Sequence, residues 1–316
     1  FIPDTAFLVP LLNNPAININ ADGFIQVSEA NAYTGEINVE WNSITDLTGI
    51  EAFISITVLN CSNNQISNLN LATNTALTQV VCANNQINNL NVNTILSLSY
   101  LNCSNNQLSN IDVSANTALS YLNCSYNGLN ILDVSANTAL SYLNCSYDGL
   151  SVLDVSSNIV LTELKCRYNG LSSIDLTSNL ALLKLDFYSN VLNNLDLSNN
   201  LSLTHLTCGG NALTSLDLSA NTVLDSLTCE SNGLLSINLS SNLYLEVLDC
   251  KYNMLTFLDV STNAALTRLD CSYNQITSIT ISGLKYLQEL NCTNNKLTAL
   301  NVAGITDLSK LYCDNN

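Results

Sequence analysis

The sequence is poor in positive charge. Only 8 of its 316 residues are Lys or Arg, whereas 25 are Asp or Glu, so the net charge is −17. Residues 1–164 contain no Lys or Arg at all. Binding to nucleic acid needs a basic surface for the phosphates, and attachment to anionic lipid headgroups needs the same. The composition therefore argues against both kinds of partner.

The chain also lacks the groups on which most catalysis depends. It has a single histidine, His205, and no GxSxG, HExxH or phosphate-binding loop. General acid–base and nucleophilic chemistry need a positioned pair of reactive groups in a shielded pocket. No run of 18 or more apolar residues occurs, so no membrane-spanning helix is expected. We therefore expect neither an enzyme nor a protein inserted in a membrane.

What the sequence does have is a 21-residue repeat. LNCSNNQLSNIDVSANTALSY at 101–121 is followed directly by LNCSYNGLNILDVSANTALSY at 122–142. Asn stands three residues after the cysteine position in twelve of thirteen copies, and Asp148 is the exception. One copy cannot bury its own apolar face, so a fixed period of this length indicates stacked repeats that share a continuous core.

Each copy but one carries a cysteine, and Phe187 takes that position in the exception. The cysteines are Cys61, Cys82, Cys103, Cys124, Cys145, Cys166, Cys208, Cys229, Cys250, Cys271, Cys292 and Cys313. Side chains alternate between the faces of a strand, so each cysteine points inward with the leucine two residues before it. Free Cys packs as a small hydrophobe, and no CxxC or Cys/His cluster suggests zinc. We expect buried, unpaired thiols.

Written as LxxLxCxxNxL followed by LDVSxN, the repeat resembles the leucine-rich repeat over residues 56–316. The resemblance implies a right-handed solenoid with a parallel sheet on one face and short extended segments on the other. A small α-helical cap should close the N-terminal end, with a short helix between residues 5 and 14. We expect the cap over 1–36 and the solenoid over 37–316, with one divergent repeat, then about thirteen repeats of which the last is truncated.

Two resemblances bear on location. ITDLTGIEAF at 44–53 is similar to secreted bacterial proteins of internalin type, and the DVSxNTAL repeats are similar to cysteine-bearing repeat proteins exported by Bacteroidetes. They imply a bacterial protein that is secreted or held at the cell surface. The recurring NCS and NCT tripeptides would be glycosylated on the sheet face in a eukaryotic secretory pathway, which also favours a bacterial source. We expect a monomer.

The segment NINADGFIQVSE at 18–29 resembles the calcium loop of an EF-hand, with Gly23 at its sharp turn. Its candidate ligands are Asn18, Asn20, Asp22, the Phe24 carbonyl and Glu29. Ca²⁺ takes six or more oxygen ligands, and a bidentate carboxylate closes such a loop. The resemblance predicts a structural Ca²⁺ site, and the alternative is a polar Asx turn that needs no metal.

Copies in register place equivalent outward side chains in columns along the sheet face. The tyrosines of these columns are Tyr100, Tyr121 and Tyr142 in one, and Tyr126, Tyr147 and Tyr168 in another. Tyrosine is enriched at interfaces because it combines a large apolar ring with a polar tip. The columns predict a surface for a protein or carbohydrate ligand, with flat rings suited to a sugar. Alternatively, the aromatic pairs simply stabilise the sheet.

The first basic residues of the chain fall on the same predicted face. With their neighbours they complete the candidate ligand-binding set, which is Lys165, Arg167, Lys184, Tyr188 and His205. We expect a partner to touch this irregular stretch, although ion pairs with Glu163 and Asp186 could also explain it. The sequence thus favours a recognition or adhesion module, and the alternative is a structural spacer or stalk without a specific ligand.

Two other features have structural interpretations. The acids from Asp112 to Asp217, one per repeat on the opposite face, are interpreted as capped turns facing solvent rather than as a calcium ladder. Trp41 stands in the divergent first repeat, and we expect it to plug the junction between cap and solenoid.

Overall fold

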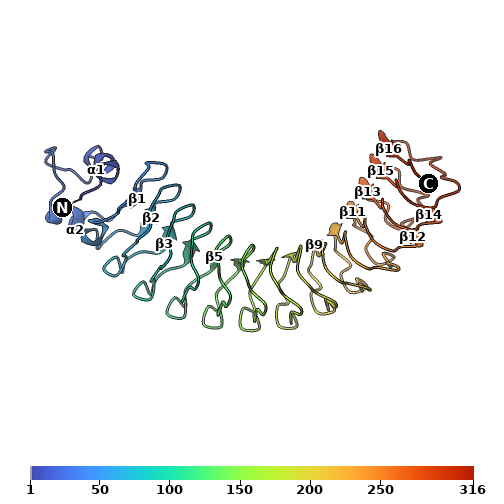
Figure 1. Ribbon diagram of the computed structural model, residues 1–316, viewed down its shortest axis with the longest axis horizontal. Coiled ribbons are helices and arrows are strands. Elements are labelled where there is room, and N and C mark those ends of the chain that lie inside the picture. Colours follow the sequence, from blue (N-terminus) through green and yellow to red (C-terminus); the bar gives the residue numbers. More distant parts are fainter. Residues whose placement is uncertain (1) are drawn as a thin grey trace. The chain divides into compact units, whose positions relative to one another are not determined.

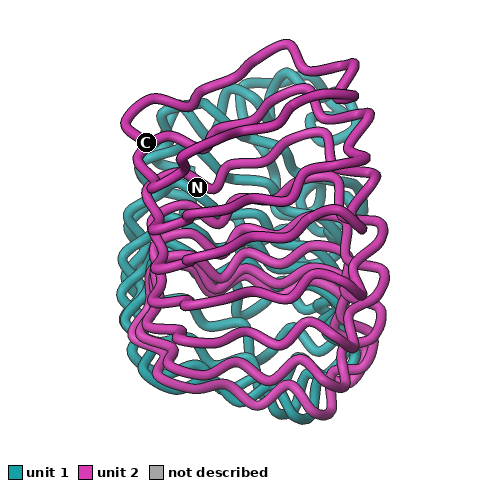
Figure 2. Tube along the Cα trace, turned by 90° about the vertical axis from the view of Figure 1, so that its right-hand side faces the viewer, with its two compact units in different colours: residues 1–158 teal, residues 159–316 magenta. Residues whose placement is uncertain are grey.

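The computed structural model describes residues 2–316, and the chain divides into two compact units, 1–158 and 159–316 (Figure 2). Each unit is a stack of similar coils, and each coil contributes one short strand to a parallel sheet (Figure 1). The solenoid expected from the repeat is therefore confirmed in both units.

The N-terminal part of the first unit contains two short helices, α1 (Thr5–Leu12) and α2 (Val27–Ala32) (Figure 1). Asp4 caps α1, because its carboxylate accepts a hydrogen bond from the Ala6 N–H at 2.8 Å. The same carboxylate accepts from the Thr45 N–H at 2.8 Å, which ties the helix to the first coil. The short helix predicted between residues 5 and 14 is present, and Phe7 is its fully buried anchor.

The strands of the first unit are three residues long and recur with the repeat. They are β1 (Glu36–Asn38), β2 (Val58–Asn60), β3 (Gln79–Val81), β4 (Tyr100–Asn102), β5 (Tyr121–Asn123) and β6 (Tyr142–Asn144), with a 3₁₀ turn η1 (Ile50–Ala52). Each pair of neighbours is parallel and aligns equivalent residues, so Tyr121 lies between Tyr100 and Tyr142. The predicted columns follow directly from this register.

The second unit repeats the arrangement. Its main strands are β7 (Glu163–Lys165), β8 (Lys184–Asp186), β9 (His205–Thr207), β10 (Ser226–Thr228), β11 (Val247–Asp249), β13 (Arg268–Asp270), β15 (Glu289–Asn291) and β16 (Lys310–Tyr312). They pair in parallel in that order. A separate parallel pair, β12 (Phe257–Asp259) and β14 (Ser278–Thr280), provides extended segments outside this sheet.

The core of the coils contains the leucine and cysteine positions. Eleven cysteines are buried, and no disulfide joins cysteines among the described residues. Burial raises the pKa of thiols such as Cys82, to about 12, so they stay protonated and unreactive near neutral pH. Cys313 departs from the prediction because it is exposed in the described structure.

Asparagine side chains satisfy the backbone where the coils turn. Asn106, three residues after Cys103, donates from Nδ2 to the Cys82 and Cys103 carbonyls at 3.0 and 3.1 Å. Its Oδ1 accepts from the Ile87 N–H at 3.0 Å. Bonds of this kind join consecutive coils inside the protein, where unpaired backbone groups would be costly. On the opposite side Asn116 donates in the same way, from Nδ2 to the Val92 and Ile95 carbonyls at 3.0 and 2.8 Å.

Of the two structural interpretations, one is confirmed and one is wrong. Asp112 accepts bonds from the Ser114 N–H and hydroxyl at 2.9 and 2.7 Å, so the acids of this series do cap exposed turns. Trp41 does not plug the junction, because 75% of its surface is exposed. Its backbone φ is 60°, and this left-handed conformation turns the side chain away from the core.

Candidate ligand-binding face

Tyr100, Tyr121 and Tyr142, which we call the strand tyrosines, form a continuous stack. The ring centroids of Tyr100 and Tyr121 are 4.1 Å apart with planes at 7°, and those of Tyr121 and Tyr142 are 4.3 Å apart at 3°. Burial and a hydrogen bond with Tyr121 raise the pKa of Tyr100 to about 12, so its hydroxyl is neutral near pH 7. Ring faces thus cover one another, and solvent meets mainly ring edges and hydroxyls. Open ring faces are therefore limited to the ends of this stack, and sugar binding stays a prediction.

The second column lies where the chain leaves the strand, two residues after the cysteine position. Tyr126 and Tyr147 stack with centroids 4.1 Å apart and planes at 13°. Their φ angles are 55° and 59°, in the left-handed region that favours Gly and Asn. Tyr126 is 51% exposed, so neither its backbone nor its burial favours a tyrosine there.

This left-handed position recurs in every 21-residue repeat. Its occupants are Asn63, Asn84, Asn105, Tyr126, Tyr147, Tyr168, Ser189, Gly210, Ser231, Tyr252, Tyr273, Asn294 and Asn315. We call the five tyrosines among them the turn tyrosines. Sequence reasoning missed Tyr252 and Tyr273, which stack at 4.3 Å in the second unit and are 47% and 45% exposed. Aligning the repeats at this one position would have found them.

The basic residues predicted as ligand contacts in the second unit already have acidic neighbours. Lys165 Nζ lies 2.6 Å from a Glu163 oxygen, and Arg167 Nε lies 3.1 Å from an Asp186 oxygen. His205 Nδ1 lies 3.3 Å from Asp225. Lys184, on the neighbouring strand, is exposed. Local ion pairing therefore accounts for much of this cluster, and it presents no net basic patch.

Tyr168 and Tyr188 come together in the same region, although less regularly than the other tyrosines. Their centroids are 5.5 Å apart with planes at 55°, and the Arg167 guanidinium lies 5.1 Å from the centre of the Tyr188 ring. Beside them, a Cβ on Gly209 would lie only 3.1 Å from Tyr188 Cε2 and 2.9 Å from Glu230 Cγ. Because Gly209 has no side chain, the Tyr188 and Glu230 side chains can lie close to its backbone.

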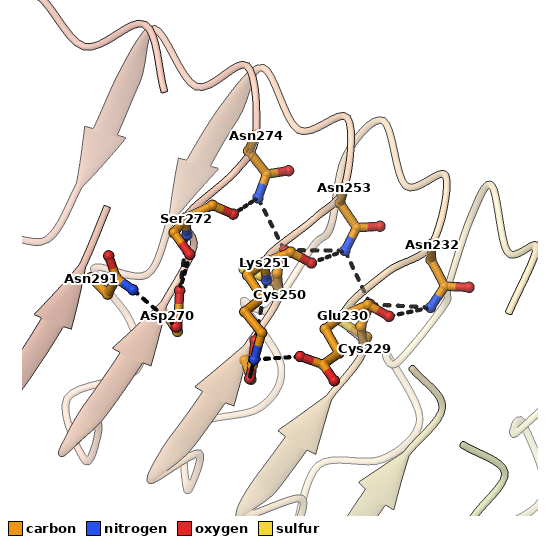
Figure 3. Close-up of polar contacts among 11 residues, drawn as sticks. Cys229, Glu230, Asn232, Cys250, Lys251, Asn253, Asp270, Ser272, Asn274 and Asn291 are labelled. Atoms are coloured by element: carbon orange, nitrogen blue, oxygen red, sulfur yellow. Dashed lines mark hydrogen bonds and ion pairs between the residues drawn. The ribbon is translucent and has the colours of Figure 1, made fainter. Parts of the chain in front are cut away.

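Figure 3 shows the next part of the second unit's face, where Lys251 points toward Glu230. Lys251 forms an ion pair with Glu230 and another with Asp249, whose oxygen lies 2.6 Å from Nζ. Hydrogen bonds and charge from these two acids raise the pKa of Lys251, against the opposing effect of its burial. Tyr252 follows directly, so the second stacked pair of turn tyrosines lies beside an acidic, ion-paired surface.

In the N-terminal loop the predicted calcium ligands are gathered but engaged with one another. The Glu29 carboxylate is almost fully buried and accepts bonds from the Ile19 N–H at 3.0 Å and the Gln26 N–H at 2.9 Å. Asp22 accepts from the Phe24 N–H at 2.8 Å and from the Asn20 amide at 3.0 Å.

One oxygen of this loop has no such partner, because Asn18 Oδ1 is buried and accepts no hydrogen bond within the described residues. An ion would have to replace several N–H donors on the Asp22 and Glu29 carboxylates. The described geometry is that of an Asx turn, and calcium binding stays a prediction. Among residues 2–316, no three His, Cys, Asp or Glu side chains are grouped as metal ligands.

Comparisons with known proteins agree with this architecture. A family model described as two copies of leucine-rich repeats matches residues 264–304. The functional domain of InlJ from Listeria monocytogenes, which includes a cysteine ladder, is 32% identical with a TM-score of 0.93. The match covers 99% of this chain and 70% of that one. The chain therefore belongs to the leucine-rich repeat family. Its cysteine-bearing repeats are those of a bacterial member, similar to the InlJ domain.

More distant structures share the fold. An internalin, InlF, from Listeria monocytogenes is 23% identical, with a TM-score of 0.88 over 98% of this chain and 95% of that one. The plant peptide hormone receptor RGFR1, solved in complex with RGF2, is 21% identical, with a TM-score of 0.68 over 84% of this chain and 52% of that one. No curated protein gives a significant match. Within residues 2–316, no helix is long and apolar enough to cross a membrane.

Proposed function

We propose that this chain is a non-enzymatic recognition module of a bacterial surface or secreted protein, and that it binds a protein ligand through its turn tyrosines. Similarity to internalins supports the location, and the leucine-rich repeat fold supports a role in protein interaction. The ligand surface in the first unit is centred on Tyr126 and Tyr147. The second unit carries its own surface around Tyr252 and Tyr273.

One observation carries this proposal: tyrosine occupies a left-handed backbone position in five repeats. A bulky residue there costs about 1 kcal/mol or more. The other repeats have small residues at this position, mostly Asn, with Gly210, Ser189 and Ser231 in three of them. Stacking of Tyr126 on Tyr147 stabilises the fold by only about 0.5–1.5 kcal/mol, which is less than the conformational cost of the two strained residues. Stability therefore does not explain these tyrosines, and contact with a partner does.

The chemistry of the surface favours a protein over a sugar. Stacked rings cover each other's faces, so the ligand meets ring edges, hydroxyls and the amides of the neighbouring Asn123 and Asn144. Ring edges and amides suit the mixed apolar and polar side chains of a protein partner. Sugar recognition by aromatic stacking needs an open ring face, which these pairs offer only at the ends of each stack.

The test is a pulldown of surface proteins together with a glycan array, each probed with the parent chain and with a Tyr126→Asn, Tyr147→Asn double variant. Asn occupies the equivalent turn at Asn105, so the variant keeps a backbone-compatible residue. A matched control is Tyr244→Asn, because Tyr244 is an exposed tyrosine outside the turn positions.

We expect a protein that the parent and the Tyr244 control retain and that the double variant loses. Truncating a central interface aromatic costs about 2 kcal/mol or more. A ligand bound equally by all three proteins would contradict the assignment of the surface. If no protein or glycan is retained by the parent, the chain is a spacer, and the recognition role is wrong.

A further inference from the structure

The asparagine that follows each cysteine by three residues has a fixed pattern of bonds, because it both donates and accepts. Asn127 donates from Nδ2 to the Cys103 and Cys124 carbonyls at 3.2 and 2.8 Å, while its Oδ1 accepts from the Leu108 N–H at 3.0 Å. Figure 3 shows donation of this kind to cysteine carbonyls in the second unit, by Asn232 to Cys229 and by Asn253 and Asn274 to Cys250. The amide group therefore faces carbonyl oxygens at this position and must be a donor.

Asp148 is the one residue that breaks this pattern. Its Oδ1 keeps the accepting half, with bonds from the Asn127 and Leu129 N–H groups at 3.2 and 3.1 Å. Its Oδ2 takes the place of the donating Nδ2, is buried, and has no hydrogen-bond partner within the described residues. An ionised carboxylate at this position directs negative charge at carbonyl oxygens. A protonated one has an O–H that can donate to them.

The unit that contains Asp148 has no basic side chain that could neutralise its charge. Residues 1–158 contain no Lys, Arg or His, and the first bases along the chain, Lys165 and Arg167, form ion pairs with Glu163 and Asp186. Charge on Asp148 helps to raise the pKa values of Cys103 and Cys124, which are buried thiols of the two preceding repeats. Burial raises the pKa of Asp148 itself to about 7, and its two accepted N–H bonds oppose the shift only in part.

We propose that Asp148 is a proton-dependent latch for the turn tyrosines of the first unit. When protonated, its Oδ2 donates to the carbonyls that asparagine bonds in the other repeats, and the coil around Tyr147 is held closed. When ionised, the same oxygen repels those carbonyls and the coil loosens. Because Tyr147 immediately precedes Asp148 and stacks on Tyr126, the ligand surface is better ordered in mildly acidic conditions. This consequence for binding rests on the proposed function, whereas the latch itself does not.

The sign of the effect follows from the raised pKa. The folded state holds this proton more tightly than the unfolded chain, in which the carboxyl has its ordinary value of 3.8. The stabilisation from Asp148 is therefore complete below about pH 4, is lost as the pH rises, and is gone above about pH 7. Ordinary surface carboxylates, whose pKa values are lowered in the folded protein, give the opposite trend.

The test compares the parent with Asp148→Asn, which restores the donor that the other repeats use. Hydrogen–deuterium exchange of the peptide spanning 142–150 is measured at pH 5 and pH 8, with both proteins at each pH so that intrinsic rates cancel. We expect a small advantage for Asp148→Asn at pH 5, and about tenfold or more slower exchange in Asp148→Asn at pH 8. The melting temperature of Asp148→Asn should exceed that of the parent by a larger margin at pH 8 than at pH 5.

A second variant, with aspartate at the equivalent position of an earlier coil, provides the control. Asn106→Asp puts a carboxylate at the equivalent position two coils earlier, so it should lose protection and stability at pH 8 and recover most of both at pH 5. Equal exchange of parent and Asp148→Asn at both pH values would overturn the latch. Since these measurements use no ligand, a failure of the proposed function would leave their outcome unchanged.

Discussion

At the scale of single residues, the backbone conformation of one repeat position indicates whether its side chain serves the fold or another role. Two residues after each cysteine position, the chain turns with φ between 49° and 64°. Asn and Gly tolerate this turn, so their presence needs no further explanation. Tyrosine does not, and its repeated occurrence there points to a role outside the fold. By contrast, the buried thiols two residues earlier are explained by packing alone.

The first residue-scale prediction concerns the stability of Tyr126→Asn, Tyr147→Asn. The substitution relieves two strained conformations and removes one ring stack, so the two effects nearly cancel. Chemical denaturation should give a free energy of unfolding within about 1 kcal/mol of the parent's, or higher. A loss beyond about 2 kcal/mol would mean that these tyrosines serve the fold after all.

The second residue-scale prediction concerns the cysteines. Titration with a thiol reagent should detect one reactive group in the native protein, Cys313, because the other eleven are buried. Unfolding in denaturant without oxidant should release all twelve. Fewer than twelve would reveal pairing that the structure does not contain, and several reactive thiols before unfolding would mean that the coils open readily.

At the scale of elements, the N-terminal loop joins α1 and α2 and is held by its own side chains. Glu29 lies in the first turn of α2, where its carboxylate also accepts the Gln26 N–H and so forms a capping box. The loop therefore has a stable form that needs no ion. Within the described loop, Asn18 Oδ1 remains as a buried side-chain oxygen without a donor.

Calcium should raise the melting temperature of the parent if the loop binds it, because a ligand of the folded state stabilises by mass action. The increment should vanish in Glu29→Gln, which removes the bidentate carboxylate. Glu29→Gln will also weaken the cap of α2, so the informative quantity is the difference between calcium and chelator in each protein. Identical melting curves of the parent in calcium and in chelator would contradict the site.

At the scale of the whole molecule, negative charge is distributed unevenly. Residues 1–158 contain 11 Asp or Glu and no Lys or Arg, whereas residues 159–316 contain 14 acids and all 8 bases. Ion pairs such as Lys251 with Glu230 and Asp249 are therefore confined to the second unit. In the first unit only solvent ions can screen the repulsion between like charges.

The stability of the protein should accordingly increase with salt. Between about 10 mM and 150 mM ionic strength the Debye length falls from about 30 Å to 8 Å, which removes most repulsion between separated surface carboxylates. Thermal unfolding followed by circular dichroism should show a higher melting temperature in 150 mM NaCl than at low salt. A lower melting temperature would show that surface ion pairs outweigh the repulsion.

The repeat by itself determined most of the fold. A period of 21 with Leu, Cys and Asn at fixed offsets leaves stacked coils as the only way to bury the apolar positions, so the parallel register and the buried thiols could be predicted. The columns Tyr100 to Tyr142 followed from that register. The exposure of Trp41 could not be foreseen, since its left-handed backbone belongs to the divergent coil and not to the repeat pattern.

Only the tertiary structure decided what the tyrosines present and what Asp148 faces. Spacing places two rings in adjacent coils, but their distance of about 4 Å and nearly parallel planes decide that edges rather than faces meet the solvent. The sequence shows Asp148 as one exception among thirteen copies, and three-dimensional contacts show that its second oxygen occupies a donor's place. Sequence periodicity specifies which residues are neighbours, whereas hydrogen-bond direction and backbone conformation arise only once the coils are stacked.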